Sequence, residues 1–164
     1  MARKGSKKAY TKWDRCVYVL DMLTAGILKV GMTADLPKRL RQVEAKYNVK
    51  PKVLYNTDTH LIGALVERAA LLELRPYRLN NGSDREMFVV APDKAISVVK
   101  RNFSFYLQDI TGRSGKERTT IQESIEAYLA IFDRAEHWNS YDKLDLWPSA
   151  VNPDLTMIRK KTIT

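Results

Sequence analysis

Cysteine and histidine are scarce in this chain, which has one cysteine and two histidines among its 164 residues. The single cysteine, Cys16, excludes a disulfide within the chain, and its place in an apolar run predicts a buried, unreactive thiol. His60 and His137 lie far apart in the sequence, with no second histidine or cysteine beside either of them. A disulfide-stabilised fold is therefore excluded, and the sequence argues against a zinc site.

Long hydrophobic runs are also missing. No apolar segment reaches the length of a transmembrane helix, and the basic N-terminal segment is not followed by the apolar stretch of a signal peptide. We therefore expect a soluble, cytoplasmic protein that does not span a membrane. Hydrophobic residues still make up 45% of the chain, which is enough for the core of one ordinary domain.

Acidic residues are outnumbered by basic ones. Lys and Arg total 28 against 19 Asp and Glu, which gives a formal net charge of +9 at pH 7. Such an excess indicates an anionic partner, with nucleic acid as the first candidate and an acidic membrane surface as the second. Charge alone leaves open a third alternative, a basic protein that has no anionic partner.

Composition divides the chain into four parts. Residues 1–15 carry six Lys or Arg against one acid and predict a basic arm. Residues 16–106 alternate between strand-like and helix-like patterns and predict a compact core. Residues 107–118 are predicted to be a basic linker, because the stretch 109–118 is rich in Gly, Ser, Lys and Arg. Residues 119–164 are predicted to form one helix and an irregular tail.

Hydrophobic periodicity predicts the elements of the core. The connection between the first two predicted strands is short, which favours an antiparallel hairpin. Strands are predicted at 16–21, 26–30, 53–57 and 86–90, and helices at 33–48, 60–75, 92–106 and 119–138. The expected fold class is therefore α/β (α+β), a small, mainly antiparallel sheet of three to four strands flanked by helices, with a C-terminal helical extension.

A charged residue lies in the second predicted strand. Lys29 alternates with Leu28 and Val30, so its side chain points to the opposite face of the sheet. Either that face is open to water or a functional site lies there. Tyr18 in the first strand stands between apolar neighbours, so its hydroxyl group needs a hydrogen-bond partner.

Tyr18, Lys29, Gly31 and Arg39 follow one another at offsets of 11, 2 and 8 residues. The stretches CVY, KVG and GMTADLPKRL resemble the GIY segment, the YIG segment and the arginine-bearing helix of the GIY-YIG nuclease superfamily. With lysine in place of the second tyrosine, the chain is similar to a phage-rich branch that is usually described only as DNA-binding. At least one restriction-enzyme branch also carries a lysine there. The resemblance covers roughly residues 16–90.

The resemblance implies an active site made of Tyr18, Lys29, Arg39 and Glu67. Glu67 would bind one divalent metal ion, Mg²⁺ or alternatively Mn²⁺. Spacing alone fits equally well with Glu67 on the solvent face of its helix beside Arg68. In the implied chemistry Arg39 binds the phosphate, Tyr18 orients or deprotonates water, and Lys29 is either a general base or a permanent cation.

Further residues are expected to support this site and to bind DNA. Gly31 and Thr33 would be structural, and Asn80 and Glu86 would hold the catalytic side chains in position without contacting the substrate. DNA-binding residues are expected at Lys7, Lys8, Lys38, Arg41, Arg113, Lys116 and Arg118.

The predicted function is a DNA endonuclease of phage, mobile-element or restriction type that hydrolyses phosphodiester bonds with a single metal ion. The alternative is a DNA-binding regulator or replication factor that keeps the fold and does not cut. Double-stranded DNA is the expected partner, and a bacterial or phage-infected cell is the expected setting. A homodimer would present one active site to each strand.

Overall fold

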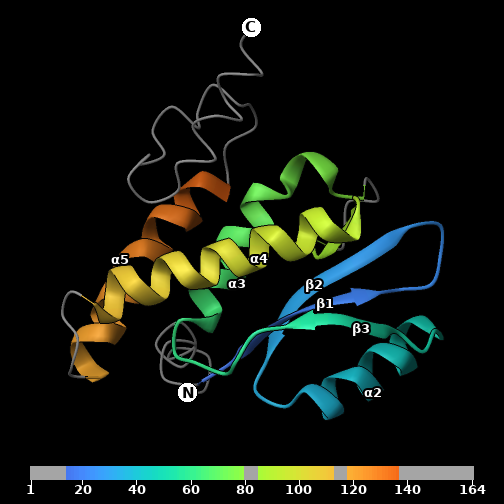
Figure 1. Cartoon of the computed structure of the whole chain (residues 1–164), viewed down its shortest axis with the longest axis horizontal. Helices are drawn as coiled ribbons and strands as arrows, with labels where there is room; N and C mark the ends of the chain where they lie inside the picture. Colours follow the sequence, from blue (N-terminus) through green and yellow to red (C-terminus); the bar gives the residue numbers. More distant parts are fainter. Residues whose placement is uncertain (1–13, 80–84, 113–117, 137–164) are drawn as a thin grey trace, which may run out of the picture.

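The computed structural model describes residues 14–79, 85–112 and 118–136. Its centre is a four-stranded antiparallel sheet with the strand order β3-β1-β2-β4 (Figure 1). The strands are β1 (Cys16–Asp21), β2 (Ile27–Thr33), β3 (Lys52–Asn56) and β4 (Met87–Val89).

Helices cover both faces of the sheet. Helix α2 lies on one face, and α3, α4 and α5 pack together on the other (Figure 1). The helices are α2 (Leu36–Tyr47), α3 (Gly63–Glu73), α4 (Pro92–Tyr106) and α5 (Arg118–Glu136), with a 3₁₀ turn at Arg75–Tyr77 and a π-helical turn at Leu107–Thr111. This arrangement confirms the predicted fold class and the C-terminal helical extension.

The hairpin of β1 and β2 forms the middle of the sheet. Its tight turn carries three residues with positive φ, at Leu23, Ala25 and Gly26. Strand β2 is longer than predicted, because pairing with β1 continues past residue 30 as far as Thr33, which lies opposite Cys16. The alternation of side chains along this hairpin assigns each residue to one of two cores.

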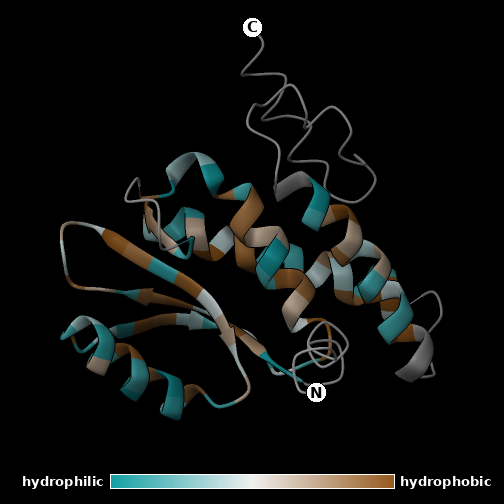
Figure 2. Ribbon diagram, turned by 180° about the vertical axis from the view of Figure 1, so that it is seen from behind, coloured by the Kyte–Doolittle hydropathy of each residue, from teal (hydrophilic) through white to brown (hydrophobic). Residues whose placement is uncertain are grey.

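The larger core lies between the sheet and helices α3, α4 and α5, and it receives Leu28 and Val30 from β2. The smaller core lies under α2 and receives Val43 from that helix. Lys29 is on this second face and is only 7% exposed. The alternative that its face is open to water is therefore wrong. In Figure 2 the sheet separates an outer, mainly hydrophilic α2 from the helical layer on the other face.

The chain stays helical beyond the predicted end of the core. The π-helical turn continues α4 to Thr111, where the sequence predicted a linker, and residues 113–117 lie outside the described part. Helix α5 then packs back on the core through Ile121, Ile125 and Phe132, which are buried. None of the helices in the described ranges combines the length and the hydrophobicity needed to cross a bilayer.

Candidate functional site

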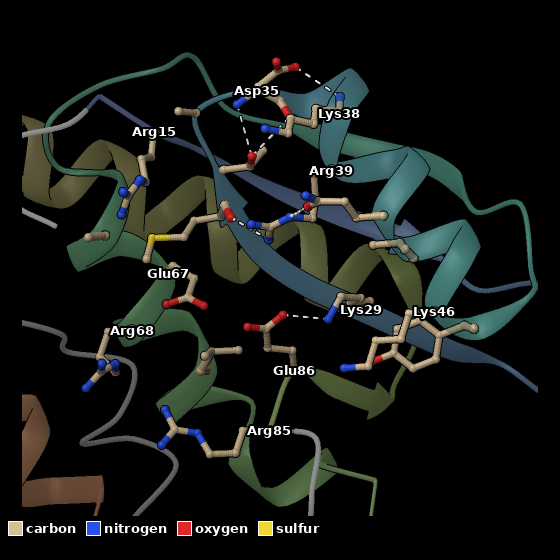
Figure 3. Close-up of a pocket in the computed structure, with 18 of the residues that line it drawn as sticks. Arg15, Lys29, Asp35, Lys38, Arg39, Lys46, Glu67, Arg68, Arg85 and Glu86 are labelled. Carbon is tan, nitrogen blue, oxygen red and sulfur yellow. Dashed lines mark hydrogen bonds and ion pairs between the residues drawn. The ribbon is translucent and has the colours of Figure 1, made fainter. Parts of the chain in front are cut away.

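A cleft of about 880 Å³ lies between α2 and α3, with the end of β2 and the start of β4 as its floor (Figure 3). Its charged lining is mostly basic, with seven basic side chains against three carboxylates. The basic residues are Arg15, Lys29, Lys38, Arg39, Lys46, Arg68 and Arg85, and the acidic ones are Asp35, Glu67 and Glu86. The basic side chains therefore favour an anionic ligand, and the carboxylates add a smaller region of negative charge within the cleft.

Arg39 is held on the α2 wall of the cleft by three hydrogen bonds. Its Nη1 donates to the Tyr18 hydroxyl at 3.2 Å and to the main-chain carbonyl of Met32 at 3.1 Å, and its Nε donates to Gln42 at 3.0 Å. No acceptor for Nη2 is found among the described residues. The guanidinium group is thus fixed in position while it keeps donors for a phosphate.

Tyr18 is fully buried, and its hydroxyl accepts a hydrogen bond from Arg39, which is the partner that its apolar neighbours in the sequence could not supply. Burial, opposed in part by the hydrogen bond from Arg39, raises its pKa to about 12. The ring lies over Gly31, its partner across the hairpin, where an added Cβ would come within 2.4 Å of the hydroxyl oxygen. Gly31 is therefore required by the close approach of the ring.

Lys29 forms an ion pair with Glu86, with Nζ 2.7 Å from Oε1. The same Nζ lies 5.7 Å from the centre of the Tyr47 ring. Glu86 precedes β4, whose residue Met87 pairs with Lys29 across the sheet, so strand register brings the two side chains together. A carboxylate and an aromatic face are partners that suit a cationic ammonium group.

Glu67 is buried in the wall formed by α3, with 6% exposure. The carboxylates of Glu67 and Glu86 point toward one another across the floor of the cleft (Figure 3). Burial, and then the negative charge of Glu86, raises the pKa of Glu67 to about 7, although Arg68 and Arg85 oppose the shift. No hydrogen bond or ion pair to the Glu67 carboxylate is found in the part of the chain that the structure describes.

Thr33 and Asp35 shape the turn from β2 into α2. The Thr33 hydroxyl accepts a hydrogen bond from the Asp35 amide at 3.0 Å, and the Asp35 side chain accepts from the amide of Lys38 at 3.1 Å. Asp35 is therefore the N-cap of α2. This cap sets where α2 begins and so places Arg39 one turn into the helix.

A sequence model of the T5orf172 domain matches residues 15–103, slightly more than half of the chain. The chain belongs to the T5orf172 domain family. This domain is part of a GIY-YIG-like, phage-type nuclease superfamily, so the predicted superfamily is confirmed at that level. The family is one of phage-type nuclease or DNA-binding domains, which agrees with DNA as the partner. Comparisons with curated proteins and with solved structures give no match.

The T5orf172 domain brings Lys29, Arg39, Glu67 and Glu86 into one cleft, with Tyr18 directly behind Arg39. Of the predicted DNA-binding residues, Lys38 lines the cleft, whereas Arg41 is exposed on α2 and does not line it. The remaining predictions lie outside what the structure describes: Lys7, Lys8, Asn80, Arg113, Lys116 and the side chain of Arg118.

Several cleft residues of the T5orf172 domain were missed by sequence reasoning. Lys46 carried a usable signal, because it follows Arg39 at helical spacing on the same face of α2. Arg15 and Arg85 carried no such signal, because contacts between distant segments bring them to the cleft. Arg15 forms a β-bridge with His60, and Arg85 lies two residues before β4, which pairs with β2. Within the described ranges no group of three or more His, Cys, Asp or Glu gathers into a metal cage.

Proposed function

We propose that this T5orf172 domain protein is a metal-dependent DNA endonuclease that hydrolyses phosphodiester bonds, and that it belongs to the lysine-bearing branch of its superfamily. The proposal rests on the burial of the Glu67 carboxylate in a basic cleft. A buried carboxylate in a basic cleft, to which none of the described residues donates a hydrogen bond, lowers the stability of the fold, and such groups are typical of functional sites.

A divalent ion fits the residues that are present. The Glu67 carboxylate offers hard oxygen ligands, and the carboxylate of Glu86 faces it. A site with one or two carboxylates suits Mg²⁺, which keeps several waters and takes further oxygens from substrate phosphates. When bound there, the ion would neutralise phosphate charge and lower the pKa of a water molecule. Mn²⁺ prefers similar ligands.

The remaining side chains have roles that follow from their contacts. Arg39, whose Nη2 has no acceptor in the described part of the chain, would bind oxygens of the scissile phosphate, where negative charge increases in the transition state. Tyr18, whose high pKa keeps it a neutral phenol, would hold Arg39 in place and orient water rather than deprotonate it. Lys29, ion-paired to Glu86, acts as a cation that stabilises charge.

A second candidate function is supported by the same ion pair. A lysine engaged with Glu86 is poorly placed to remove a proton from water, and the basic lining alone suffices to bind DNA. The alternative is therefore a DNA-binding regulator or replication factor that does not cut.

Incubation with supercoiled plasmid distinguishes the two functions. The endonuclease is expected to produce nicked circles in Mg²⁺ or Mn²⁺ and none in EDTA. Gel-shift assays in EDTA report DNA binding independently of cutting. Binding without nicking in either metal would overturn the endonuclease proposal and leave the DNA-binding one.

A further inference from the structure

Arg68 directly follows Glu67 on α3 and lines the cleft on the wall opposite Arg39 (Figure 3). Its side chain is 26% exposed, so water and ligands reach it while most of the chain is covered. The two arginines therefore stand on either side of the carboxylates of Glu67 and Glu86. A phosphate-bearing strand in the cleft would pass between them.

Helix α5 holds Arg68 in this place. Nη1 of Arg68 donates to the Asp133 carboxylate on α5, and Asp133 is not among the residues that line the cleft. Arg68 is therefore held in position by a residue that lies outside the cleft. An arginine has five N–H donors, and no acceptor for the Nε or Nη2 donors of Arg68 is found among the described residues.

Helix α5 is not part of the segment matched by the T5orf172 domain, which ends at residue 103. It is nevertheless firmly attached, because Ile125 and Phe132 are fully buried in the main core. Leu129 of the same helix also lines the cleft. The C-terminal extension thus forms part of the wall of the site.

We propose that Arg68 binds a DNA phosphate next to the one held by Arg39, and that Asp133 positions Arg68 for this contact. The inference rests on the proposed function in taking DNA as the ligand and Arg39 as the residue that binds the neighbouring phosphate. An arginine fixed by one hydrogen bond loses less side-chain entropy when it binds a phosphate. Gln42 and Tyr18 fix Arg39 in the same way.

Fluorescence anisotropy with a short labelled duplex tests the role of Arg68, with Ca²⁺ replacing Mg²⁺ to suppress cutting. Arg68→Ala is expected to weaken binding about tenfold and to reduce the slope of log affinity against log salt by about one. Arg134→Ala is the matched control, because it removes the same charge from an exposed position of α5 that does not line the cleft. Equal losses in the two variants would overturn the assignment of Arg68.

Asp133→Leu tests the positioning role. General electrostatics predicts tighter DNA binding when a carboxylate is removed, whereas loss of positioning predicts binding several-fold weaker than in the wild type. A double variant, Arg68→Asp with Asp133→Arg, restores the pairing of charges and hence the docking of α5. It is expected to unfold like the wild type and still to bind DNA weakly.

Tighter binding by Asp133→Leu would overturn the positioning role, and full DNA affinity in the double variant would overturn the phosphate contact of Arg68. These outcomes are read relative to wild-type binding. If the wild type itself does not bind the duplex, the proposed function fails. If the wild type binds and the variants behave as the control does, only the inference about Arg68 and Asp133 fails.

Discussion

Substitution of Glu67 by glutamine should stabilise the protein, because the charge of this carboxylate is costly to bury. Its pKa rises from 4.5 to about 7 in the folded state, chiefly through burial. At about 1.4 kcal/mol for each tenfold change in proton affinity, the ionised form destabilises the fold by about 3 kcal/mol. The folded protein binds the extra proton between these two pH values, so stability falls as pH rises through that window.

Urea unfolding followed by circular dichroism in EDTA measures this effect. We expect Glu67→Gln to be more stable than the wild type by up to about 3 kcal/mol at pH 8, with the difference shrinking toward zero near pH 4.5. Glu73→Gln on the same helix is the matched control. Glu73 is equally buried, but it accepts hydrogen bonds from Arg101 and from Asn102, the latter at 3.1 Å.

The control should change stability in the opposite direction. Loss of the charge of Glu73 weakens its contact with Arg101 and is expected to cost about 1–3 kcal/mol at pH 8. If Glu67→Gln is as destabilising as Glu73→Gln, or if its effect does not depend on pH, the view of Glu67 as a buried charge that no described residue pairs with is refuted.

Three further predictions concern the cleft. Gly31→Ala should destabilise the fold by about 1–3 kcal/mol in urea unfolding, because the new Cβ would lie 2.4 Å from the Tyr18 hydroxyl oxygen and must displace the ring; wild-type stability would contradict this. At subsaturating Mg²⁺ the nicking rate should rise as the pH approaches about 7 and then level off, because protons compete with the metal for Glu67. A rate that falls between pH 6 and 8 would count against it. Lys29→Arg should retain part of the nicking activity if Lys29 acts as a cation. Because arginine does not deprotonate, complete loss of nicking with wild-type stability and DNA binding would instead indicate that Lys29 is a general base.

The arrangement of the sheet and α2 could be predicted because the signals are local. Alternation of side chains over 16–21 and 26–30, with a short connection, specified the hairpin. The helical pattern over 33–48 predicted α2, which begins at Leu36 in the structure with the Asp35 side chain as its cap. Such features depend on neighbours a few residues away, which the sequence displays directly.

The environment of the charged residues could not be predicted in the same way. Lys29 and Glu86 are 57 residues apart and meet because β2 pairs with β4. Arg68 and Asp133 are 65 residues apart and meet because α5 docks on α3. Spacing along the chain does not reveal such pairings, so the sequence left open whether Arg68 faced solvent, and it did not specify the ion pair of Lys29.

In the proposed function, Glu67 is required for cutting DNA and is not required for binding it. The most direct measurement compares single-turnover nicking of supercoiled plasmid in Mg²⁺ by the wild type and by Glu67→Gln, at protein concentrations that saturate the DNA. We expect nicking by the wild type, and no nicking by the variant although it binds DNA at least as tightly. Nicking by Glu67→Gln at the wild-type rate would contradict it.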